Sequence, residues 1–593
     1  MSASNDSEVA TIDTVEKMRR DWIRNPSGPF RVIMPSQKQG HVFWSALSKN
    51  IELVDDSDNE KISIFSQYYI DSDARRAKEI SRTLMLQACN DCIDNIYLLN
   101  ERIYTPEEMG FNTPEEIDLY AQKIVQIDCG QRMTYKSVFD YVSDNEVKGH
   151  IIICNSDIFF DKTIDNIRYM NLTESRRALC LLRYEYDGEK SLKDCKLFGP
   201  RADSQDTWII HSSNIPDSNF KKAFDFALGI PGCDNKMTYL FQVCGIECFN
   251  VPNHIRTYHY HRSQKRNYNS QTKPVPTPWV SLIPIVPNES NEYVEHSYNI
   301  QYENDNLFNY VSGKLEKGET FIIPRIAGVE NDLAYYGVAI GQGIISERDF
   351  IEQNAAKVFE VMKNNAGIKL ENINDIRSYS NLYLEAFHKC DAYFDWEPWG
   401  NVYPFIRDSH DFITTNFEKK RIWSLTLDVF NNIQRRPWTW SLKGKRLLIV
   451  SSFVDSIKSK LDTLSKVYGV DLFPDCTFVF LKPPQTQGRN PSLDFKQELG
   501  LLGSRIAEIK DTFDVALLSC GGYGNPLIGM LHSMDISAIY IGGVLQMYFG
   551  IYGARWLRER PDIMRLYLNK HWTRPTVTER PNGHEQVEKS CYW

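Results

Sequence analysis

The stretch GHIIICNSDIFFD, residues 149–161, decides the fold of the first half of the chain. An apolar run, Ile151–Cys154, stops at Asn155-Ser156-Asp157, and a second apolar pair, Phe159-Phe160, follows. A short apolar run bounded by polar turn residues predicts a buried strand. Asp157 then stands at the carboxyl end of that strand, either as the cap of the next turn or as a carboxylate delivered to a site.

Strand and helix patterns alternate on the N-terminal side of this stretch. We expect strands at residues 61–70, 93–100 and 123–129, and helices at 74–90 and 134–145. Strands that alternate with helices predict a mostly parallel sheet covered by helices, which is the α/β class. In such a sheet, ligands bind beyond the carboxyl ends of the strands, where Asp157 is expected.

Composition sets the outer limits. A chain of 593 residues is too long for one core, so we expect at least two domains. The net charge is −9 without a basic stripe, which argues against nucleic acid and membrane surfaces as partners. No apolar run reaches the ~20 residues of a transmembrane helix, and the polar N-terminus does not resemble a signal peptide. The 13 scattered cysteines indicate reduced thiols and a cytoplasmic location.

A polar and then proline-rich stretch divides the chain. Residues 263–294 lack helical periodicity and predict an extended linker. We therefore expect an N-terminal extension at 1–58, a first domain at 59–262 and a second domain at 295–593. Helices dominate the start of the second domain, and its last part alternates again. The expected elements there are strands at 445–453, 513–522 and 538–543 and a helix at 525–534.

Polar residues further along the chain are candidates to join Asp157. Asp234 opens a predicted helix, where the helix dipole favours a carboxylate as a cap, but a general base is also a carboxylate at a pocket rim. His259 and His261 alternate in a predicted strand and so share one face. Hard cations such as Mg²⁺ and Mn²⁺ prefer carboxylate oxygens and bridge to phosphates, so Asp157 and a histidine suit a metal site.

This order of motifs resembles the GT-A glycosyltransferases over about residues 60 to 262. The resemblance implies that Asp157 is the second acid of the metal motif, with Asn155 in the place of the first. It also implies that Asp234 is the base of an inverting reaction, that Cys233 stands where Glu is usual, and that His259 is the late metal ligand. The cofactor would be Mn²⁺ or Mg²⁺. The further donor-binding residues that it implies are Asn100, Glu101 and Asp128 for the base and ribose, and Arg132 and Lys136 for the diphosphate.

The segment FGPRADSQDTWIIH, residues 198–211, offers an acceptor site. A carboxylate beside an aromatic ring suits a sugar, whose apolar face stacks on the ring while its hydroxyls bond to the carboxylate. Asp203, Asp206 and Trp208 are the candidates. The alternative is a surface loop followed by an ordinary strand.

In the second half, an apolar strand runs into Gly521, Gly522 and Gly524. Glycines at a strand-to-helix junction let backbone N–H groups approach a phosphate, although a tight turn alone also requires glycine. The stretches GGYGNPL (521–527), IGGVLQMYFGIYGARW (541–556) and HWTRP (571–575) resemble the GT-D glycosyltransferase family, as does the terminal CYW.

In the GT-D family an Asp-x-Glu motif follows an arginine, and PRIAGVENDLA (324–334) aligns with it. Arg325 and Glu330 match, whereas Gly328 replaces the aspartate. The resemblance covers about residues 310 to 593. It implies a catalytic role for Glu330, and donor binding by the three glycines together with Arg555 and Arg574.

The two resemblances together predict two Rossmann-like domains, GT-A-like and GT-D-like, joined by the linker. We expect a bifunctional enzyme that transfers sugars from nucleotide-sugar donors to a glycan or glycoconjugate acceptor. Because each half lacks one acid of its metal motif, an alternative is one active domain fused to a degenerate acceptor-binding module. A third hypothesis is a purely structural or polysaccharide-binding protein.

Overall fold

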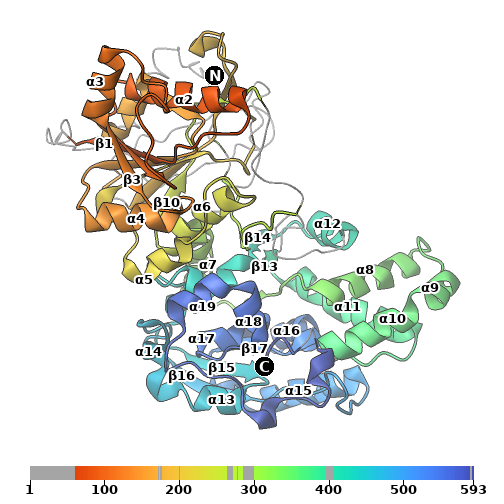
Figure 1. The fold of residues 1–593 in the computed structure, drawn as a ribbon. Coiled ribbons are helices and arrows are strands. Elements are labelled where there is room, and N and C mark those ends of the chain that lie inside the picture. Colours follow the sequence, from red (N-terminus) through yellow and green to blue (C-terminus); the bar gives the residue numbers. More distant parts are fainter. Residues whose placement is uncertain are drawn as a thin grey trace, which may run out of the picture. The chain divides into compact units, whose positions relative to one another are not determined.

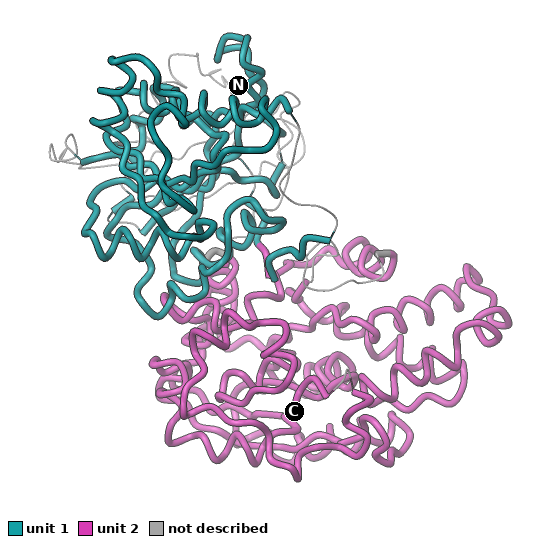
Figure 2. The backbone as a smooth tube through the Cα atoms, viewed as in Figure 1, with its two compact units in different colours: residues 1–276, 280–299 teal, residues 277–279, 300–593 magenta. Residues whose placement is uncertain are grey.

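The structure is a computed structural model that describes residues 60–170, 172–173, 176–199, 201–263, 271–276, 278–282, 284, 300–395, 407–587 and 590–593. The chain divides into two compact units, one of residues 1–276 and 280–299 and one of residues 277–279 and 300–593 (Figure 2). The expected N-terminal extension, residues 1–58, lies outside the described residues.

The first unit is built on a seven-stranded sheet with the order β10-β6-β9-β4-β1-β2-β3. Strands β1 to β4 run parallel to one another, and β9 runs antiparallel between β4 and β6. The strands of this sheet are β1 (Ile62–Ser66), β2 (Asn95–Asn100), β3 (Ile124–Asp128), β4 (His150–Cys154), β6 (Arg177–Leu181), β9 (Thr207–His211) and β10 (Glu247–Phe249).

Helices cover both faces of this sheet. On one face, α2 buries Ile80 and Leu84 against Ile64 of β1 and Ile152 of β4. On the other face, Phe139 of α4 packs against Phe241 of α6. The helices of the unit are α2 (Ala74–Ala88), α3 (Pro114–Lys123), α4 (Tyr135–Asp144), α5 (Ser218–Lys221) and α6 (Cys233–Val243), and Figure 1 labels them. Because both faces are covered, every residue of the central strands β1 and β4 is buried.

A smaller sheet with the order β5-β11-β7-β8 joins the carboxyl end of β4. Its strands are β5 (Ile158–Phe160), β7 (Tyr184–Tyr186), β8 (Lys196–Leu197) and β11 (Thr257–Tyr260). Strand β11 pairs antiparallel with β5 and parallel with β7, which places His259 opposite both Ile158 and Glu185. This register brings the late histidines next to Asp157.

The second unit contains a five-stranded, fully parallel sheet with the order β12-β18-β17-β15-β16. Its strands are β12 (Ile322–Ile323), β15 (Arg446–Ser451), β16 (Thr477–Leu481), β17 (Val515–Ser519) and β18 (Ser537–Tyr540). A two-stranded sheet, β13 (Ala392–Asp395) and β14 (Lys420–Trp423), accompanies it.

Helices surround the parallel sheet, and α11 packs on both α8 and α16. The longer helices are α7 (Ile300–Glu316), α8 (Gly328–Gly341), α11 (Ile373–Lys389), α12 (Arg407–Asn416), α15 (Phe495–Glu508) and α16 (Gly524–His532). The shorter ones are α9 (Glu347–Gln353), α10 (Ala355–Val361), α13 (Val454–Lys458), α14 (Leu464–Tyr468), α17 (Leu545–Tyr548), α18 (Ala554–Glu559) and α19 (Pro561–Tyr567). The α/β, Rossmann-like class predicted from the sequence is confirmed.

Residues 271–276 and 280–282 of the expected linker form a strap along the first unit. Val275, Val280 and Leu282 in it are buried. The N–H of Leu282 donates to the carbonyl of Ala202 at 2.9 Å, and the N–H of Val280 donates to the carbonyl of Asn235 at 3.2 Å. The stretch is polar enough to suggest a free connector, yet its few apolar side chains bind it to the segments that carry Asp206 and Asp234.

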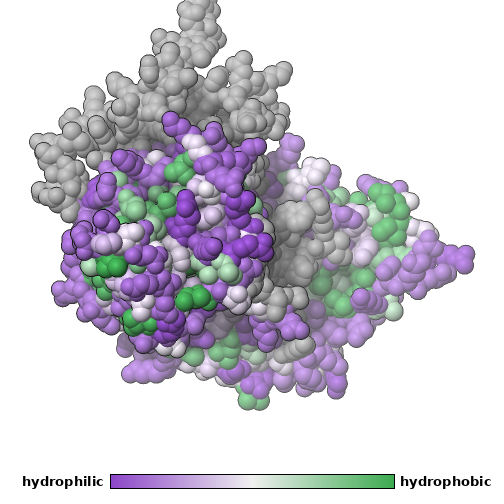
Figure 3. Space-filling view, turned by 45° about the horizontal axis from the view of Figure 1, so that its top comes forward, coloured by the Kyte–Doolittle hydropathy of each residue, from purple (hydrophilic) through white to green (hydrophobic). Residues whose placement is uncertain are grey.

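The cysteines and the surface agree with what the composition predicts, namely reduced thiols and a mainly polar exterior. All 13 cysteines lie in the described part of the chain, and each is a free thiol. Hydrophilic residues predominate on the face shown in Figure 3, where hydrophobic residues form small scattered groups. Within the described ranges, no helix has the length and apolar character that crossing a membrane would require.

The strap predicts a measurable loss of stability. Leu282→Ala should destabilise the first unit by about 2–5 kcal/mol, the usual cost of truncating a buried leucine. Urea unfolding followed by hydrogen exchange at β9 and α6 reports this unit separately. Ile103→Ala, at a side chain that is 52% exposed in the same unit, is the matched control and should change stability by less than about 0.5 kcal/mol. Equal effects of the two substitutions would show that the strap does not stabilise the unit.

Candidate functional site

Polar residues gather at the sheet edge where the parallel strands of the first unit end. Asn100 ends β2, Asp128 ends β3, and Asn155 and Asp157 follow β4. Parallel strands present their carboxyl ends at one edge, so these residues share it. The short antiparallel strand β9 begins at the same edge, because Thr207 pairs with Cys154, and this adds Asp206.

Asp157, His259 and His261 form a cluster at this edge. Asp157 Oδ2 lies 3.2 Å from His259 Nε2 and 3.5 Å from His261 Nδ1. One ligand atom from each of the three residues lies within 4.8 Å of the others. The second oxygen, Oδ1 of Asp157, is buried and accepts no hydrogen bond from the described residues. This cluster fits a divalent ion, and two imidazoles favour Mn²⁺ over Mg²⁺, which prefers oxygen ligands.

The electrostatics of the cluster keep Asp157 ionised. Burial alone would raise the pKa of Asp157, but the neighbouring His259 and Arg76 hold it well below its usual range. Burial lowers the pKa of His259, whereas Asp157 and Glu185 raise it, with a net value of about 9. Without a metal, the imidazole is therefore a cation held between two carboxylates.

Arg76 is a cluster member that no sequence pattern indicated. The side chain of Asp73 caps α2 and accepts hydrogen bonds from the N–H groups of Arg75 and Arg76, which fixes the first turn of the helix. From there Arg76 Nη2 reaches Asp157 Oδ2 at 2.6 Å, and Arg76 Nη1 lies 3.3 Å from Glu79 Oε2. All three side chains are buried.

Side chains of alternating charge connect the cluster of Asp157, His259 and His261 to the loop that carries Asp206. Glu185 accepts from His259 at 3.1 Å and from Arg183 Nε at 2.8 Å. Arg183 also pairs with Asp206, whose other oxygen accepts from the Asn155 amide at 2.8 Å. The side-chain amide of Asn155, in the place of an expected acid, therefore orients Asp206.

Asp234 lies in the first turn of α6, after Gly232, which has a left-handed φ of 79°. Burial raises the pKa of Asp234 to about 7, and the negative charge of Asp206 adds to the shift. A carboxylate with such a pKa can accept a proton near neutral pH. The adjacent Cys233 is buried and its thiol has a pKa raised to about 12, so it supplies no second charge.

Burial argues against two of the predicted ligand contacts, those of Asn100 and Trp208. The Asn100 side chain is fully buried, and it accepts from the Tyr68 N–H and donates to Gln126, so it braces the strand ends rather than facing a base. Trp208 is also fully buried, edge-on against Tyr135 at 5.1 Å between centroids. Its ring offers no face to a sugar, because β9 lies inside the sheet and is covered on both sides.

The other predicted residues of this unit lie nearer the surface. Glu101 and Asp128 are exposed at the strand ends, and Asp203 forms a two-bond pair with Arg201 at 2.6 and 2.8 Å. Arg132 donates to the carbonyl of Leu228 at 2.6 Å, and Lys136 pairs with Asp140 within α4. Both basic side chains have protein partners, and their role in binding a diphosphate stays a prediction.

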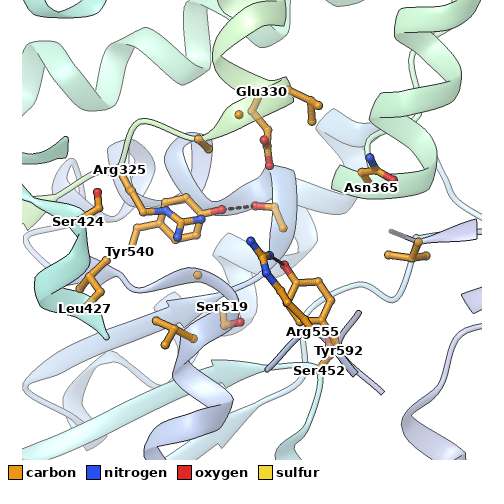
Figure 4. Close-up of a pocket in the computed structure, with 18 of the residues that line it drawn as sticks. Arg325, Glu330, Asn365, Ser424, Leu427, Ser452, Ser519, Tyr540, Arg555 and Tyr592 are labelled. Carbon is orange, nitrogen blue, oxygen red and sulfur yellow. Dashed lines mark hydrogen bonds between the residues drawn. The ribbon is translucent and has the colours of Figure 1, made fainter. Parts of the chain in front are cut away.

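The second unit has a cavity of about 320 Å³ at the carboxyl edge of its parallel sheet. Arg325 after β12, Ser452 after β15, Ser519 of β17 and Tyr540 of β18 line it, as Figure 4 shows. Charged groups of both signs line the same space: Arg325, Arg555, Arg560, Glu330, Asp332, Asp428 and Glu559.

Glu330 and Arg325 both line this cavity. Glu330 points into it from the first turn of α8, and Arg325 lies beside the ring of Tyr540 (Figure 4), with 4.9 Å from guanidinium carbon to ring centroid. The Asn525 side chain bonds to both the N–H and the carbonyl of Arg325 and so fixes its backbone. Burial raises the pKa of Asp332 to about 6. The aligned Gly328 has no side chain to bind an ion.

The glycine loop differs from the expected phosphate cradle. Gly521 lines the cavity with a φ of 56°, and its carbonyl accepts from the Tyr540 hydroxyl at 2.8 Å. At Gly522 an added Cβ would meet Ile368 Cγ1 at 2.5 Å, and at Gly524 it would meet the Tyr540 ring at 2.2 Å. Gly522 and Gly524 are therefore required for packing against protein neighbours, and neither lines the cavity.

The two predicted arginines of this unit have different positions. Arg555 is buried in the cavity wall, pairs with Glu559 at 2.8 Å and contacts the Tyr592 hydroxyl at 3.5 Å. Arg574 is exposed, donates to the carbonyl of Trp593 at 2.8 Å and does not line the cavity. Its predicted contact with a diphosphate is therefore replaced by a contact that holds the residues at the end of the chain.

Several site residues were missed or passed over by the sequence analysis. His261 was placed on one face with His259 by simple alternation, but only His259 was chosen as the metal ligand. Glu185 lies on the neighbouring strand β7 and Arg183 directly precedes it, but nothing in the sequence specifies that β7 pairs with β11. Asp332, Asp428 and Arg560 line the cavity from segments whose proximity only the fold determines.

No protein-family model matches the chain, and no curated protein matches it either. Among solved structures it is similar to GalNAc-T7 with UDP, GalNAc and Mn²⁺ at 12% identity, over 35% of this chain and 45% of that one, with a TM-score of 0.24. It is similar to a glycosyltransferase (DUF1792) from Streptococcus sanguinis at 12% identity, over 46% and 96%, with a TM-score of 0.25.

A third similar structure is the mannosyltransferase PcManGT from Pyrobaculum calidifontis in complex with GDP-Man and Mn²⁺. The identity is 9%, over 44% of this chain and 64% of that one, with a TM-score of 0.21. The chain thus spans less than half of GalNAc-T7. Similarities this weak give no basis for assigning an activity to this chain.

The packing role of Gly522 predicts a stability effect. Gly522→Ala should destabilise the second unit by about 1–3 kcal/mol, the usual cost of overpacking, because Ile368 is fully buried and cannot move aside freely. Gly500→Ala is the matched control, since an added Cβ there meets nothing within 4 Å and the helix gains from alanine. Urea midpoints of the two variants test this, and an unchanged midpoint for Gly522→Ala would contradict the packing role.

Proposed function

We propose that this chain is a glycosyltransferase that transfers sugars from nucleotide-sugar donors to a glycan or glycoconjugate acceptor. In this proposal the first unit is inverting and metal-assisted, and the second unit contains a second donor site. The observation that carries the proposal is the convergence of Asp157, His259 and His261 with Asp234 around one sheet edge. A cation site and a carboxylate with a pKa near 7 are the two parts that this chemistry needs.

The residues of the first unit divide the chemistry between them. A divalent ion held by Asp157, His259 and His261 would supply positive charge to the departing diphosphate. Asp234 accepts the proton of the acceptor hydroxyl as that oxygen attacks the anomeric carbon. Asp206, oriented by Asn155 and Arg183, holds the pKa of Asp234 up through its negative charge.

The cavity of the second unit supports the second donor site. It lies beyond the carboxyl ends of parallel strands, where such folds bind ligands. Arg325 and Arg555 offer positive charge for a diphosphate, and Glu330 offers a carboxylate in the same cavity. The rival proposal, an acceptor-binding module without catalysis, is favoured by Gly328, which leaves Glu330 without the partner acid of the GT-D motif.

Two single variants and their combination separate these proposals in the full-length chain. Asp157→Asn should lower the rate of transfer by the first unit, and Glu330→Gln should lower the rate of transfer by the second, each by at least about 10²-fold. The assay follows release of nucleoside diphosphate from a panel of nucleotide sugars. If the chain is bifunctional, each variant loses a different product and the double variant loses both.

If Glu330→Gln leaves every product unchanged, the second unit is not a second enzyme. If no nucleotide sugar is consumed by the wild-type chain or by either variant, in the presence of Mn²⁺ and candidate acceptors, the glycosyltransferase proposal fails.

The pKa of Asp234 predicts the pH dependence of the first transfer. The carboxylate is the active form, so turnover should fall about tenfold per pH unit below pH 7, the value to which the pKa is raised. Asp206→Asn removes a negative neighbour and should lower the pKa of Asp234, which moves this acid limb to lower pH. Asp203→Asn, at an exposed residue that contributes less to the shift, is the control and should move it less.

Rate profiles from pH 5 to 9 measure the limb. Asp234→Asn should lower turnover by about 10²–10⁴-fold without loss of donor binding. An acid limb that stays in place in Asp206→Asn would show that the two carboxylates are not coupled.

A further inference from the structure

We propose that Arg76 competes with the divalent ion for Asp157, so that an ion enters the cluster only when the guanidinium leaves Asp157 for Glu79. The inference rests on the proposed function only for the identity of the ion's ligands. It concerns a residue that lies 81 positions before Asp157 in the chain and that no motif includes.

Competition follows from the shared oxygen. The atom of Asp157 that faces both imidazoles, Oδ2, is also the atom that Arg76 Nη2 contacts at 2.6 Å. An ion bound to Oδ2 at about 2.0–2.2 Å would lie within about 5 Å of the guanidinium. Two cations that close repel strongly in a site where both side chains are less than a tenth exposed.

The guanidinium cannot avoid this repulsion by losing its proton, because arginine stays charged in proteins. It can only move. The opposing carboxylate is already in place, since Glu79 Oε2 lies 3.3 Å from Arg76 Nη1. Glu79 is held by Ser263, whose N–H and hydroxyl donate to its two oxygens at 2.8 and 2.9 Å. Arg76 therefore spans two fixed carboxylates, and only one of them belongs to the metal cluster.

The anchoring of the helix supports a short movement. Asp73 fixes the backbone of the first turn of α2, so a change at Arg76 is confined to its side chain. The free protein keeps the charge of Asp157 compensated, as a buried carboxylate requires. The consequence is that Mn²⁺ by itself should bind weakly to the wild-type chain.

The test measures Mn²⁺ alone, without donor or turnover. The signal of free Mn²⁺ in electron paramagnetic resonance gives the affinity of the full-length chain, with Asp157→Asn defining the background from other sites. Arg76→Gln should bind Mn²⁺ at least tenfold more tightly than the wild type, because the competing cation is gone. Arg76→Lys keeps the charge and should remain weak.

Arg75→Gln is the matched control, because this neighbouring side chain is 82% exposed and forms its ion pair with Asp73, so it should match the wild type. If Arg76→Gln does not fold, as judged by circular dichroism, Glu79→Gln tests the same competition with the opposite expected change in Mn²⁺ affinity. Removing the second carboxylate leaves Arg76 on Asp157 alone and should weaken Mn²⁺ binding at least threefold.

Two results would overturn the inference, and they differ in what else they remove. If wild type and Arg76→Gln bind Mn²⁺ equally and above the Asp157→Asn background, the metal site stands but Arg76 does not compete for it. If neither binds above that background, no ion binds at Asp157, and the metal-assisted part of the proposed function fails as well.

Discussion

The buried carboxylate of Asp157 has to keep its charge compensated, and the first unit is organised around that requirement. Burial opposes ionisation, so two cations surround the group, Arg76 of α2 and His259 of β11, and the imidazole of His261 lies just after that strand. Arg76 is in turn balanced by Glu79, and His259 by Glu185. The result is a continuous polar layer along the sheet edge, from Glu79 through Asp157 and Glu185 to Asp206, in which one substitution affects several neighbours.

The second unit compensates its buried charges in a different way. Three arginines and four carboxylates line its cavity, and they are distributed over the wall rather than gathered in one cluster. Asp428 and Arg560 form a buried pair at 3.4 Å, and Arg555 pairs with Glu559, so much of the charge is neutralised inside the wall. Glu330 and Arg325 line the same space, and Arg325 donates to the carbonyl of Ile541 at 3.4 Å. If both units bind donors, as we propose, the first relies on a removable ion and the second on fixed arginines.

The sequence predicted the fold class and the position of Asp157, because apolar runs and their polar ends are local signals. Alternation on a strand placed His259 and His261 on one face, and the resemblance to the GT-A enzymes selected His259. It failed at Trp208, since a strand buried on both faces does not alternate, and at Gly522, since a glycine that clears a ligand and one that clears Ile368 look alike in a sequence. Arg76 was beyond reach, because its partner is distant in the chain and only the packing of α2 on the sheet brings them together.

The strap restricts where recombination in evolution can separate the first unit from the rest of the chain. Its buried residues, Val275, Val280 and Leu282, follow the last strand of the first unit by more than a dozen positions. Their N–H groups nevertheless donate to the carbonyls of Pro231, Asn235 and Ala202, and Asn235 is next to the proposed base. A recombination event that joined the strand-and-helix core of this unit to a new partner, and broke the chain directly after β11, would discard those contacts. Exchange of modules is therefore restricted to break points beyond Leu282, although the regular secondary structure ends well before it.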